Sequence, residues 1–346
     1  MFLHALATAV PPAAYSQADC WEIVQRSGLR RRLTKRSMLI LHSVLRGEHG
    51  IGKRHFAMPE IERVFDRSPD ELNAAFRNEA PRLAGRALTT ALERAGLRAD
   101  QLDALLVCTC TGYLCPGVSS YVAEQLGLRT DAYLQDLVGL GCGAAIPTLR
   151  SASHVLAAHP QANVACIAVE ICSAAFYLDD DPGVIVSACL FSDGAAATIW
   201  RGQPPQTGPA LRAHSFDTAH LPAERDKLRF EQRDGKLRNL LDRSVPNLAA
   251  GAVDRLWQRR GPQPVARVVT HTGGRDVLEA IAPVVAPHSL EVSHRTLRDY
   301  GNMSSPSVLF ALDAALQESV PSPEAGDYWL VSFGAGFSVH SCRLGS

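Results

Sequence analysis

The stretch DLVGLGCGAAIPTLRSASHVL, residues 136–156, places one cysteine between two glycines where an apolar run becomes a helical pattern. Gly141 and Gly143 permit a sharp strand-to-helix turn and a close approach of a substrate to the backbone. A thiol at a helix start has its thiolate favoured by the helix dipole and by free backbone N–H groups. Free cysteine is also among the residue types most often buried in cores. The stretch alone therefore leaves two interpretations of Cys142, a packed core thiol and a nucleophile.

The overall composition is that of an ordinary globular chain with no dominant charge. Its 346 residues are 46% hydrophobic, which is enough to bury a large core and suggests two domains or one large duplicated domain. Lys and Arg together number 35, as do Asp and Glu, so no global field favours nucleic acid or an anionic membrane surface. No uninterrupted apolar run reaches membrane-spanning length, so no integral membrane segment is expected.

The cysteines and the N-terminal residues both point to a reducing compartment. Nine cysteines are an odd number, and spacings such as Cys108, Cys110 and Cys115 fit neither a disulfide framework nor a paired zinc site. The first residues lack a basic leader, and their apolar part is broken by Pro11 and Pro12. The sequence therefore predicts a cytoplasmic protein with reduced thiols and no metal site.

Apolar runs alternate with helical patterns along the first part of the chain. The spacing of apolar residues over 82–97 predicts a helix that leads into a buried strand at 103–110. The strand signature returns at 163–173 and again at 195–200. This alternation predicts an α/β fold with a covered sheet.

A similar series follows a connection rich in proline and glycine at 201–210. It contains a strand at 266–273, helices after it, and two strands joined across glycines at 328–344. Each part thus ends in a pair of strands after strand and helix units, which indicates an internal structural duplication without a visible sequence repeat. The expected halves are residues 1–205 and 206–346.

Two polar residues of the second half stand where reactive groups are often presented. His271 comes at the end of an apolar strand and precedes two glycines and a helix. Asn302 follows Gly301 at the start of a Ser-rich helix and offers a donor for an enolate or thioester oxygen. The ordinary interpretations are a hydrogen-bonded histidine at a strand end and a capping asparagine. A thiolate nucleophile needs a base or a cationic partner, so a functional role for both residues is better supported when they are considered together with Cys142.

The order Cys142, His271, Asn302 and the motifs around these residues resemble the type III polyketide synthases, the chalcone synthase-like branch of the thiolase superfamily. The resemblance covers nearly the whole chain, and the YGNMSS block with a glycine-rich C-terminal loop is specific. It implies a thiolase-like αβαβα layered fold with internal duplication, and a homodimer. The matching blocks are GLGCGAAIPTLR (139–150), LFSDGAAA (190–197), HTGGRDVLE (271–279), YGNMSSPSVLF (300–310) and SFGAGFSV (332–339).

The resemblance also implies a chemical role for each of the three residues. Cys142 would take a starter acyl group from its CoA ester and carry it during iterative condensation with malonyl-CoA. His271 would stabilise Cys142 as a thiolate and, with Asn302, polarise the malonyl thioester during decarboxylation. Two donors at the enolate oxygen lower the barrier without a metal or an organic cofactor. The expected enzyme is thus an acyltransferase that uses CoA thioesters as substrates and needs no cofactor.

Further positions match residues that line the substrate path in this family. Phe191 matches an aromatic residue that separates the CoA tunnel from the condensation cavity. The matching glycines would let the backbone approach the pantetheine arm and the growing chain. Ordinary core packing is the alternative for all of these positions. The matched cavity positions are Thr111, Cys172, Ala175 and Ser304, and the matched glycines are Gly273, Gly274, Gly334 and Gly336.

Several residues depart from the pattern of the plant enzymes and bear on the choice of starter. Ser192 and Ala335 replace a glycine and a proline, and Arg238 or Leu240 stands where a second gating phenylalanine is usual. Two cavity positions also lack the usual threonines, which predicts a roomier, less polar pocket for fatty acyl starters. The expected product is an alkylpyrone or an alkylresorcinol. The alternatives are an aromatic starter, as in chalcone and stilbene synthases, or malonyl-CoA alone, as in phloroglucinol and tetrahydroxynaphthalene synthases.

The CoA phosphate site and the enzyme class both leave alternatives open. Basic residues cluster at Arg30–Arg36 and at Arg46, Lys53 and Arg54, a region where the family holds CoA, although such clusters are commonly solvated faces. A β-ketoacyl carrier-protein synthase III shares the three residue types, but its histidine precedes Gln-Ala-Asn, whereas His271 precedes Thr-Gly-Gly. An inactive thioester-binding scaffold with a merely buried cysteine is the alternative of a different class.

Overall fold

Nine strands of the described chain form one mixed sheet, which consists of two parts joined through one strand of each part. The computed structural model describes residues 1–318 and 326–345. The strand order is β11-β12-β13-β8-β1-β7-β6-β4-β5, and the two parts join where Phe2 of β1 faces Arg212 of β8. The strands are β1 (Phe2–Ala9), β4 (Ala104–Cys108), β5 (Tyr133–Leu137), β6 (Val164–Glu170), β7 (Gly194–Arg201), β8 (Arg212–His220), β11 (Val265–Thr270), β12 (Asp327–Gly334) and β13 (Ser338–Gly345).

The two parts of the sheet repeat the same strand arrangement. In the first part, β4 and β6 are parallel, while β6 with β7 and β7 with β1 are antiparallel. In the second part, β11 and β12 are parallel, while β12 with β13 and β13 with β8 are antiparallel. β5 adds one more parallel strand beside β4. The internal duplication predicted from the sequence is therefore confirmed, and residues 202–211 connect the two parts.

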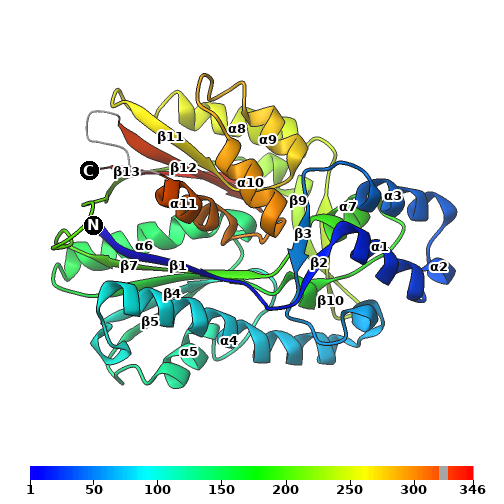
Figure 1. Cartoon of the computed structure of the whole chain (residues 1–346), viewed down its shortest axis with the longest axis horizontal. Helices are drawn as coiled ribbons and strands as arrows, with labels where there is room; N and C mark the ends of the chain where they lie inside the picture. Colours follow the sequence, from blue (N-terminus) through cyan, green and yellow to red (C-terminus); the bar gives the residue numbers. More distant parts are fainter. Residues whose placement is uncertain (319–325, 346) are drawn as a thin grey trace.

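Helices form three layers around the two parts of the sheet (Figure 1). α6 and α11 lie between the parts, because α6 contacts β4, β6, β12 and β13 while α11 contacts β1, β7, β11 and β12. α4 and α5 cover the outer face of the first part, and α8 and α9 cover that of the second. The αβαβα order confirms the predicted thiolase-like class. The helices are α4 (Pro69–Ala95), α5 (Val118–Leu126), α6 (Ala145–Ala158), α8 (Val245–Trp257), α9 (Arg275–Ile281), α10 (Glu291–Tyr300) and α11 (Ser307–Glu318).

Apolar cores fill the boundaries between these layers. The central core contains Leu149 of α6 and Leu312 of α11, which are almost fully buried because strands cover them from both sides. One outer core joins α4 to β1 and β7, and another joins α8 to β12 and β13. Burial of about 25 cal/mol per Å² of apolar surface at each boundary is the main force that holds the layers together.

Local sequence sets the bounds of the long helix α4. Ser68 accepts a hydrogen bond from the Glu71 N–H, and the Glu71 carboxylate accepts one from the Ser68 N–H, with Pro69 as the first helical residue. Gly96 ends the helix at φ +63°. The sequence predicted only the second part of this helix, and Pro81 lies where the helical pattern is interrupted.

The remaining elements build one end of the molecule, on the right in Figure 1. α7 contacts both α3 and β10 there, and β9 and β10 form a hairpin. No helix in residues 1–318 and 326–345 is long and apolar enough to cross a membrane. The elements of this end are β2 (Ala14–Ser16), α1 (Gln17–Arg26), α2 (Leu29–Arg32), α3 (Lys35–Arg46), β3 (Lys53–His55), α7 (Pro182–Leu190), β9 (Leu228–Arg233) and β10 (Lys236–Leu241).

Candidate active site

Cys142 lies in a short helical turn, Gly141–Gly143, directly before α6. The turn needs small residues around it, because Gly141 has φ +56° and a Cβ on Gly334 would lie 2.5 Å from the Gly143 nitrogen. Ser332 donates a hydrogen bond to the Gly143 carbonyl at 3.0 Å. The buried thiol therefore lies at a helix start, and β12 packs against the turn that carries it.

Cys142, His271 and Asn302 line one cavity of about 630 Å³, which we call the outer cavity. His271 follows β11 and Asn302 follows α10, so three segments far apart in the sequence meet here. The Asn302 amide is held in place, since its Oδ1 accepts a hydrogen bond from the Ser304 N–H at 2.8 Å and its Nδ2 donates to the Gly273 carbonyl at 3.3 Å. The fold thus brings together the three residues that the sequence singled out.

Burial governs the protonation of the thiol and of the imidazole. Desolvation raises the pKa of Cys142 to about 12 and lowers the pKa of His271 to about 3. The His271 ring packs edge-on against Phe333 with 5.0 Å between the ring centroids, and its Nδ1 has no partner among the described residues. A neutral thiol and a neutral imidazole are therefore the favoured resting forms.

A buried glutamate that the sequence did not single out, Glu170, organises the wall behind the thiol. It ends β6, and its Oε2 accepts hydrogen bonds from the Cys110 N–H at 2.9 Å and from the Thr111 hydroxyl at 2.8 Å. Its Oε1 accepts one from the Ser305 hydroxyl at 2.6 Å. Burial nevertheless raises the pKa of Glu170. A charged residue at the end of an otherwise apolar strand was the available sequence signal.

Ser304 connects this glutamate to Cys142. Its hydroxyl donates to Cys142 Sγ at 3.2 Å and lies 3.5 Å from Glu170 Oε1, and Cys110 Sγ is 3.3 Å away. Among the described residues, the hydrogen-bond partner of Cys142 Sγ is thus this serine rather than His271. Ser304 has φ +60°, an uncommon conformation for a residue with a side chain, which the Asn302 contact to its N–H helps to hold. The predicted cavity position is therefore a hydrogen-bond donor to the thiol.

Phe191 separates the outer cavity from an inner pocket of only about 20 Å³. Its backbone is fixed beside Asn302 by a parallel bridge, with the Ser192 N–H donating to the Asn302 carbonyl at 2.8 Å. Tyr177 and Phe230 fill much of the inner space, which leaves room for about one water molecule. The inner pocket thus gives no support to the expectation of a roomier pocket, because aromatic side chains occupy the volume. Three predicted positions, Thr111, Cys172 and Ala175, also line this inner pocket.

The residue beside Phe191 on β10 is Asn239, and the expectation of Arg238 or Leu240 as the second gate was wrong. Asn239 lines both the outer cavity and the inner pocket. Arg238 binds Asp179 at 2.8 Å and a second carboxylate, that of Glu231, at 2.9 Å. Leu240 lines only the outer cavity. Alternate residues of a strand point to opposite sides, so the correct gate lies one residue from each predicted one.

The predicted glycines divide into two pairs. Gly273 and Gly274 line the outer cavity, where their backbone is accessible to a ligand. Gly334 instead packs against the Cys142 turn, and Gly336, at φ +121°, lines a different cavity of about 430 Å³. The second pair therefore does not line the outer cavity with the first pair, since β12 uses these residues to fit against the turn and to reverse direction before β13, and their approach to the pantetheine arm and growing chain stays a prediction.

The basic residues near the N-terminus do not line the outer cavity. Arg54 is buried and donates to the backbone carbonyls of Ala188 at 2.7 Å and Phe191 at 3.1 Å, so it has a structural role. Arg243 is exposed at the cavity wall and has no ion-pair partner within the described part of the chain. The cations that do line the outer cavity are Arg229, Arg243 and Arg275.

Comparison with protein families identifies the class of this fold and site. The family model "FAE1/Type III polyketide synthase-like protein" matches residues 10–211, and the model "Chalcone and stilbene synthases, C-terminal domain" matches residues 234–345. The chain belongs to the type III polyketide synthases. It is an acyltransferase of the chalcone synthase family rather than a carrier-protein synthase III.

Curated relatives match along almost the whole chain. The 1,3,6,8-tetrahydroxynaphthalene synthase of Streptomyces peucetius subsp. caesius is 30% identical, over 98% of this chain and 92% of the relative. The 3,5-dihydroxyphenylacetyl-CoA synthase of Streptomyces toyocaensis is 29% identical, over 97% of this chain and 88% of the relative. The phloroglucinol synthase of Pseudomonas fluorescens is 24% identical, over 84% of each chain.

Solved structures share the fold over its full length. The 1,3,6,8-tetrahydroxynaphthalene synthase of Streptomyces coelicolor matches with a TM-score of 0.86 at 24% identity, and covers 100% of this chain and 99% of its own. The type III polyketide synthase domain of Steely1 from Dictyostelium matches with a TM-score of 0.88 at 22% identity, with the same coverage of both chains. The layered fold is therefore that of the solved type III polyketide synthases.

Proposed function

We propose that this enzyme uses malonyl-CoA as both starter and extender and makes a small polyhydroxylated aromatic compound. The inner pocket of about 20 Å³ supports this proposal, because so small a space beyond Phe191 disfavours a long fatty acyl starter more than a short malonyl-derived starter. The names of the relatives agree, since dihydroxyphenylacetyl-CoA, tetrahydroxynaphthalene and phloroglucinol are small rings with several hydroxyl groups. Hydroxyl groups on alternate carbons are the pattern left by two-carbon units. The alkylpyrone expectation is less well supported.

The reaction would begin with loading of Cys142. The thiol attacks the CoA thioester carbonyl while His271 takes the thiol proton, and the CoA thiolate leaves as a new thioester forms on Cys142. Because burial disfavours the isolated thiolate and the isolated imidazolium, the pair is charged only while the two opposite charges stabilise each other. The start of α6 adds favourable backbone dipoles at the sulfur.

Decarboxylation of an incoming malonyl-CoA would then supply the nucleophile. Loss of CO₂ leaves an electron pair on the malonyl-derived carbon, and the thioester oxygen takes up negative charge as an enolate. Asn302 Nδ2 has one N–H for the Gly273 carbonyl and a second for this oxygen, and the neutral His271 ring offers another N–H. The enolate carbon attacks the acyl thioester on Cys142, and the cysteine thiolate leaves.

The outer cavity would hold the CoA part of each substrate. Gly273 and Gly274 present backbone to the pantetheine arm, while the exposed Arg243 offers positive charge to the phosphates; Arg275 is paired with Asp276 at 3.1 Å. All of these steps use groups of the protein and of CoA thioesters, so the proposed reaction needs no further cofactor.

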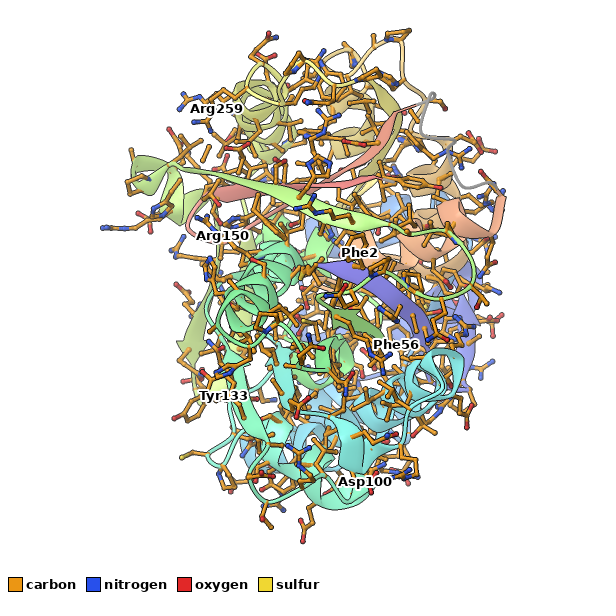
Figure 2. All side chains as sticks on the ribbon, turned by 90° about the vertical axis from the view of Figure 1, so that its left-hand side faces the viewer. Phe2, Phe56, Asp100, Tyr133, Arg150 and Arg259 are labelled. Carbon is orange, nitrogen blue, oxygen red and sulfur yellow. The ribbon has the colours of Figure 1, made fainter. Side chains whose placement is uncertain are left out.

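We also propose that the enzyme is a cytoplasmic homodimer with halves at residues 1–205 and 206–346. β5 is an edge strand that pairs only with β4 among the described strands, so its outer backbone groups can pair with a second copy. Tyr133 is 53% exposed on this strand, as is Val138 just after it, and Tyr133 lies at the surface in Figure 2. All nine cysteines are free, which suits a reducing compartment.

A panel of starters tests the proposed substrate. The enzyme is incubated with malonyl-CoA alone, or with malonyl-CoA plus hexanoyl-, dodecanoyl- or coumaroyl-CoA, and the products are identified by mass spectrometry. We expect a polyhydroxylated aromatic product from malonyl-CoA alone, and no higher kcat/KM with the other starters. Alkylpyrones or alkylresorcinols formed at a higher kcat/KM would contradict the proposal.

A further inference from the structure

The wall between the outer cavity and the inner pocket consists of Phe191 and Asn239, and we call this pair the partition. Both residues line both spaces. Phe191 is carried by the end of α7, and Asn239 lies on β10 opposite Phe230 of β9. A chain on Cys142 that extends toward the inner pocket would meet these two side chains first.

Asn239 is an unusual residue for such a place. The residue is buried, with 8% of its surface exposed, and its Oδ1 has no hydrogen-bond partner among the described residues. A buried amide oxygen without a partner is unfavourable, and the great majority of buried polar groups do have partners. The unmet acceptor of Asn239 therefore calls for a ligand that supplies a donor.

Within residues 1–318 and 326–345, no group donates a hydrogen bond to Asn239 Oδ1. The neighbours across the partition are the aromatic rings of Phe191 and Phe230. The nearest cation along the strand, Arg238, is engaged with Asp179 and Glu231. The partition thus combines one apolar ring with one amide whose oxygen lacks a donor among the described residues.

We infer that Asn239 is a specificity-determining residue that recognises the oxygenated, malonyl-derived chain and disfavours apolar acyl chains. An amide carries both an acceptor and two donors. A poly-β-keto chain offers the matching groups on alternate carbons, since its enol O–H donates to Oδ1 and its ketone oxygens accept from Nδ2. A fatty acyl chain has neither group, so its passage would leave the amide desolvated and unpaired. This inference rests on the proposed use of malonyl-CoA as starter.

The matched variants Asn239→Leu and Asn239→Gln test the inference. Leucine has the same number and branching of side-chain heavy atoms, with bulkier methyl groups and no hydrogen-bonding groups, whereas glutamine keeps the amide. We expect Asn239→Leu to lower kcat/KM for product formation from malonyl-CoA at least tenfold and to raise the share of product started by hexanoyl-CoA. Asn239→Gln should retain more malonyl-CoA activity than Asn239→Leu. The melting temperature of Asn239→Leu should equal or exceed that of the wild type, because an unpaired buried amide has been removed.

Release of CO₂ from malonyl-CoA separates this inference from the proposed function. Decarboxylation depends on His271 and Asn302, so Asn239→Leu should release CO₂ at a rate within a few-fold of the wild type while making less polyketide. If the leucine variant keeps both its kcat/KM and its starter preference, Asn239 only fills space and the inference is overturned. A wild-type enzyme that releases no CO₂ from malonyl-CoA would instead contradict the proposed function. The same substitution at the exposed Asn73 of α4 is the control.

Discussion

The two halves of the molecule have the same strand arrangement, yet equivalent positions in them hold different chemistry. The residue after β4 is Thr109, whose hydroxyl donates to Glu170, whereas the residue after β11 is His271, which faces the outer cavity. β6 ends in buried Glu170, whereas β12 ends in Gly334. The first half therefore holds a hydrogen-bonded carboxylate at these strand ends, and the second half places His271, the proposed base, at the outer cavity.

The segments that precede the two central helices also hold different residues at equivalent positions. The segment before α6 carries Cys142, and the segment before α11 carries Asn302 and Ser304. Both segments lie between the two parts of the sheet and meet through the contact from the Ser304 hydroxyl to Cys142 Sγ. A duplicated scaffold can thus bring the proposed nucleophile and the proposed oxyanion donor into one site by giving equivalent positions different residues.

Replacing His271 by alanine should have the largest effect on catalysis. The base and an enolate donor are lost together, so we expect kcat/KM to fall by about 10²–10⁴-fold. Iodoacetamide labelling of Cys142 should also slow at pH 7, because burial raises the thiol pKa to about 12 and the proposed acceptor of its proton is gone. The labelling rate of the variant should then rise about tenfold per pH unit, with a smaller rise for the wild type.

The exposed His154 on α6 gives a matched control for this substitution. His154→Ala should keep both activity and labelling close to the wild type. Equal labelling rates for His271→Ala and the wild type at about pH 7 to 10 would show that the imidazole does not activate the thiol.

Asn302→Ala should have the next largest effect, and it should act on one step. Loss of an oxyanion donor costs about 10²–10³-fold in the step it serves, so CO₂ release from malonyl-CoA should fall by that factor. Transfer of an acyl group to Cys142 should persist, because the thiol and His271 remain. Radiolabelled malonyl-CoA measures the release and mass spectrometry measures the acyl-enzyme. Unchanged CO₂ release by Asn302→Ala would show that Asn302 does not assist decarboxylation.

Glu170→Gln should have the smallest effect on catalysis and act mainly on stability. Glutamine has one acceptor oxygen in place of two, so the donors on one side of the carboxylate lose their partner, either the Ser305 hydroxyl on Oε1 or the Thr111 hydroxyl on Oε2, at a cost of about 1–3 kcal/mol for each unpaired donor. Burial raises the pKa of Glu170, so the folded wild type binds the carboxyl proton more tightly than the unfolded chain does. The wild type therefore loses stability as the pH rises from the unfolded-state pKa through the higher folded-state pKa.

The stability difference between wild type and Glu170→Gln should therefore narrow as pH rises. Denaturant unfolding at several pH values measures this difference, and the exposed Glu93→Gln on α4 is the control. A variant as stable as the wild type at every pH would contradict the assignment of Glu170 as the centre of the hydrogen-bonded wall.

Much of the fold and the three central residues could be predicted from the sequence. Alternating strand and helix patterns gave the α/β class, and the glycines around Cys142 indicated a turn before a helix. The gate on β10 could not be placed, because one residue of register decides whether Arg238 or Asn239 faces the cavity. The volume of the inner pocket was also hidden, since Phe230 fills it from a strand distant in sequence from Cys172 and Ala175.

The acyl group on Cys142 provides the most direct test of the central claim. Wild-type enzyme is mixed with malonyl-CoA, quenched in acid within seconds and digested, and its peptides are examined by mass spectrometry, with Cys142→Ala and the exposed-thiol variant Cys115→Ser as comparisons. We expect a thioester-linked malonyl-derived group on the peptide that contains Cys142, in the wild type and in Cys115→Ser, and no product from Cys142→Ala. Polyketide formation by Cys142→Ala, or turnover with no acyl group on Cys142, would contradict the account.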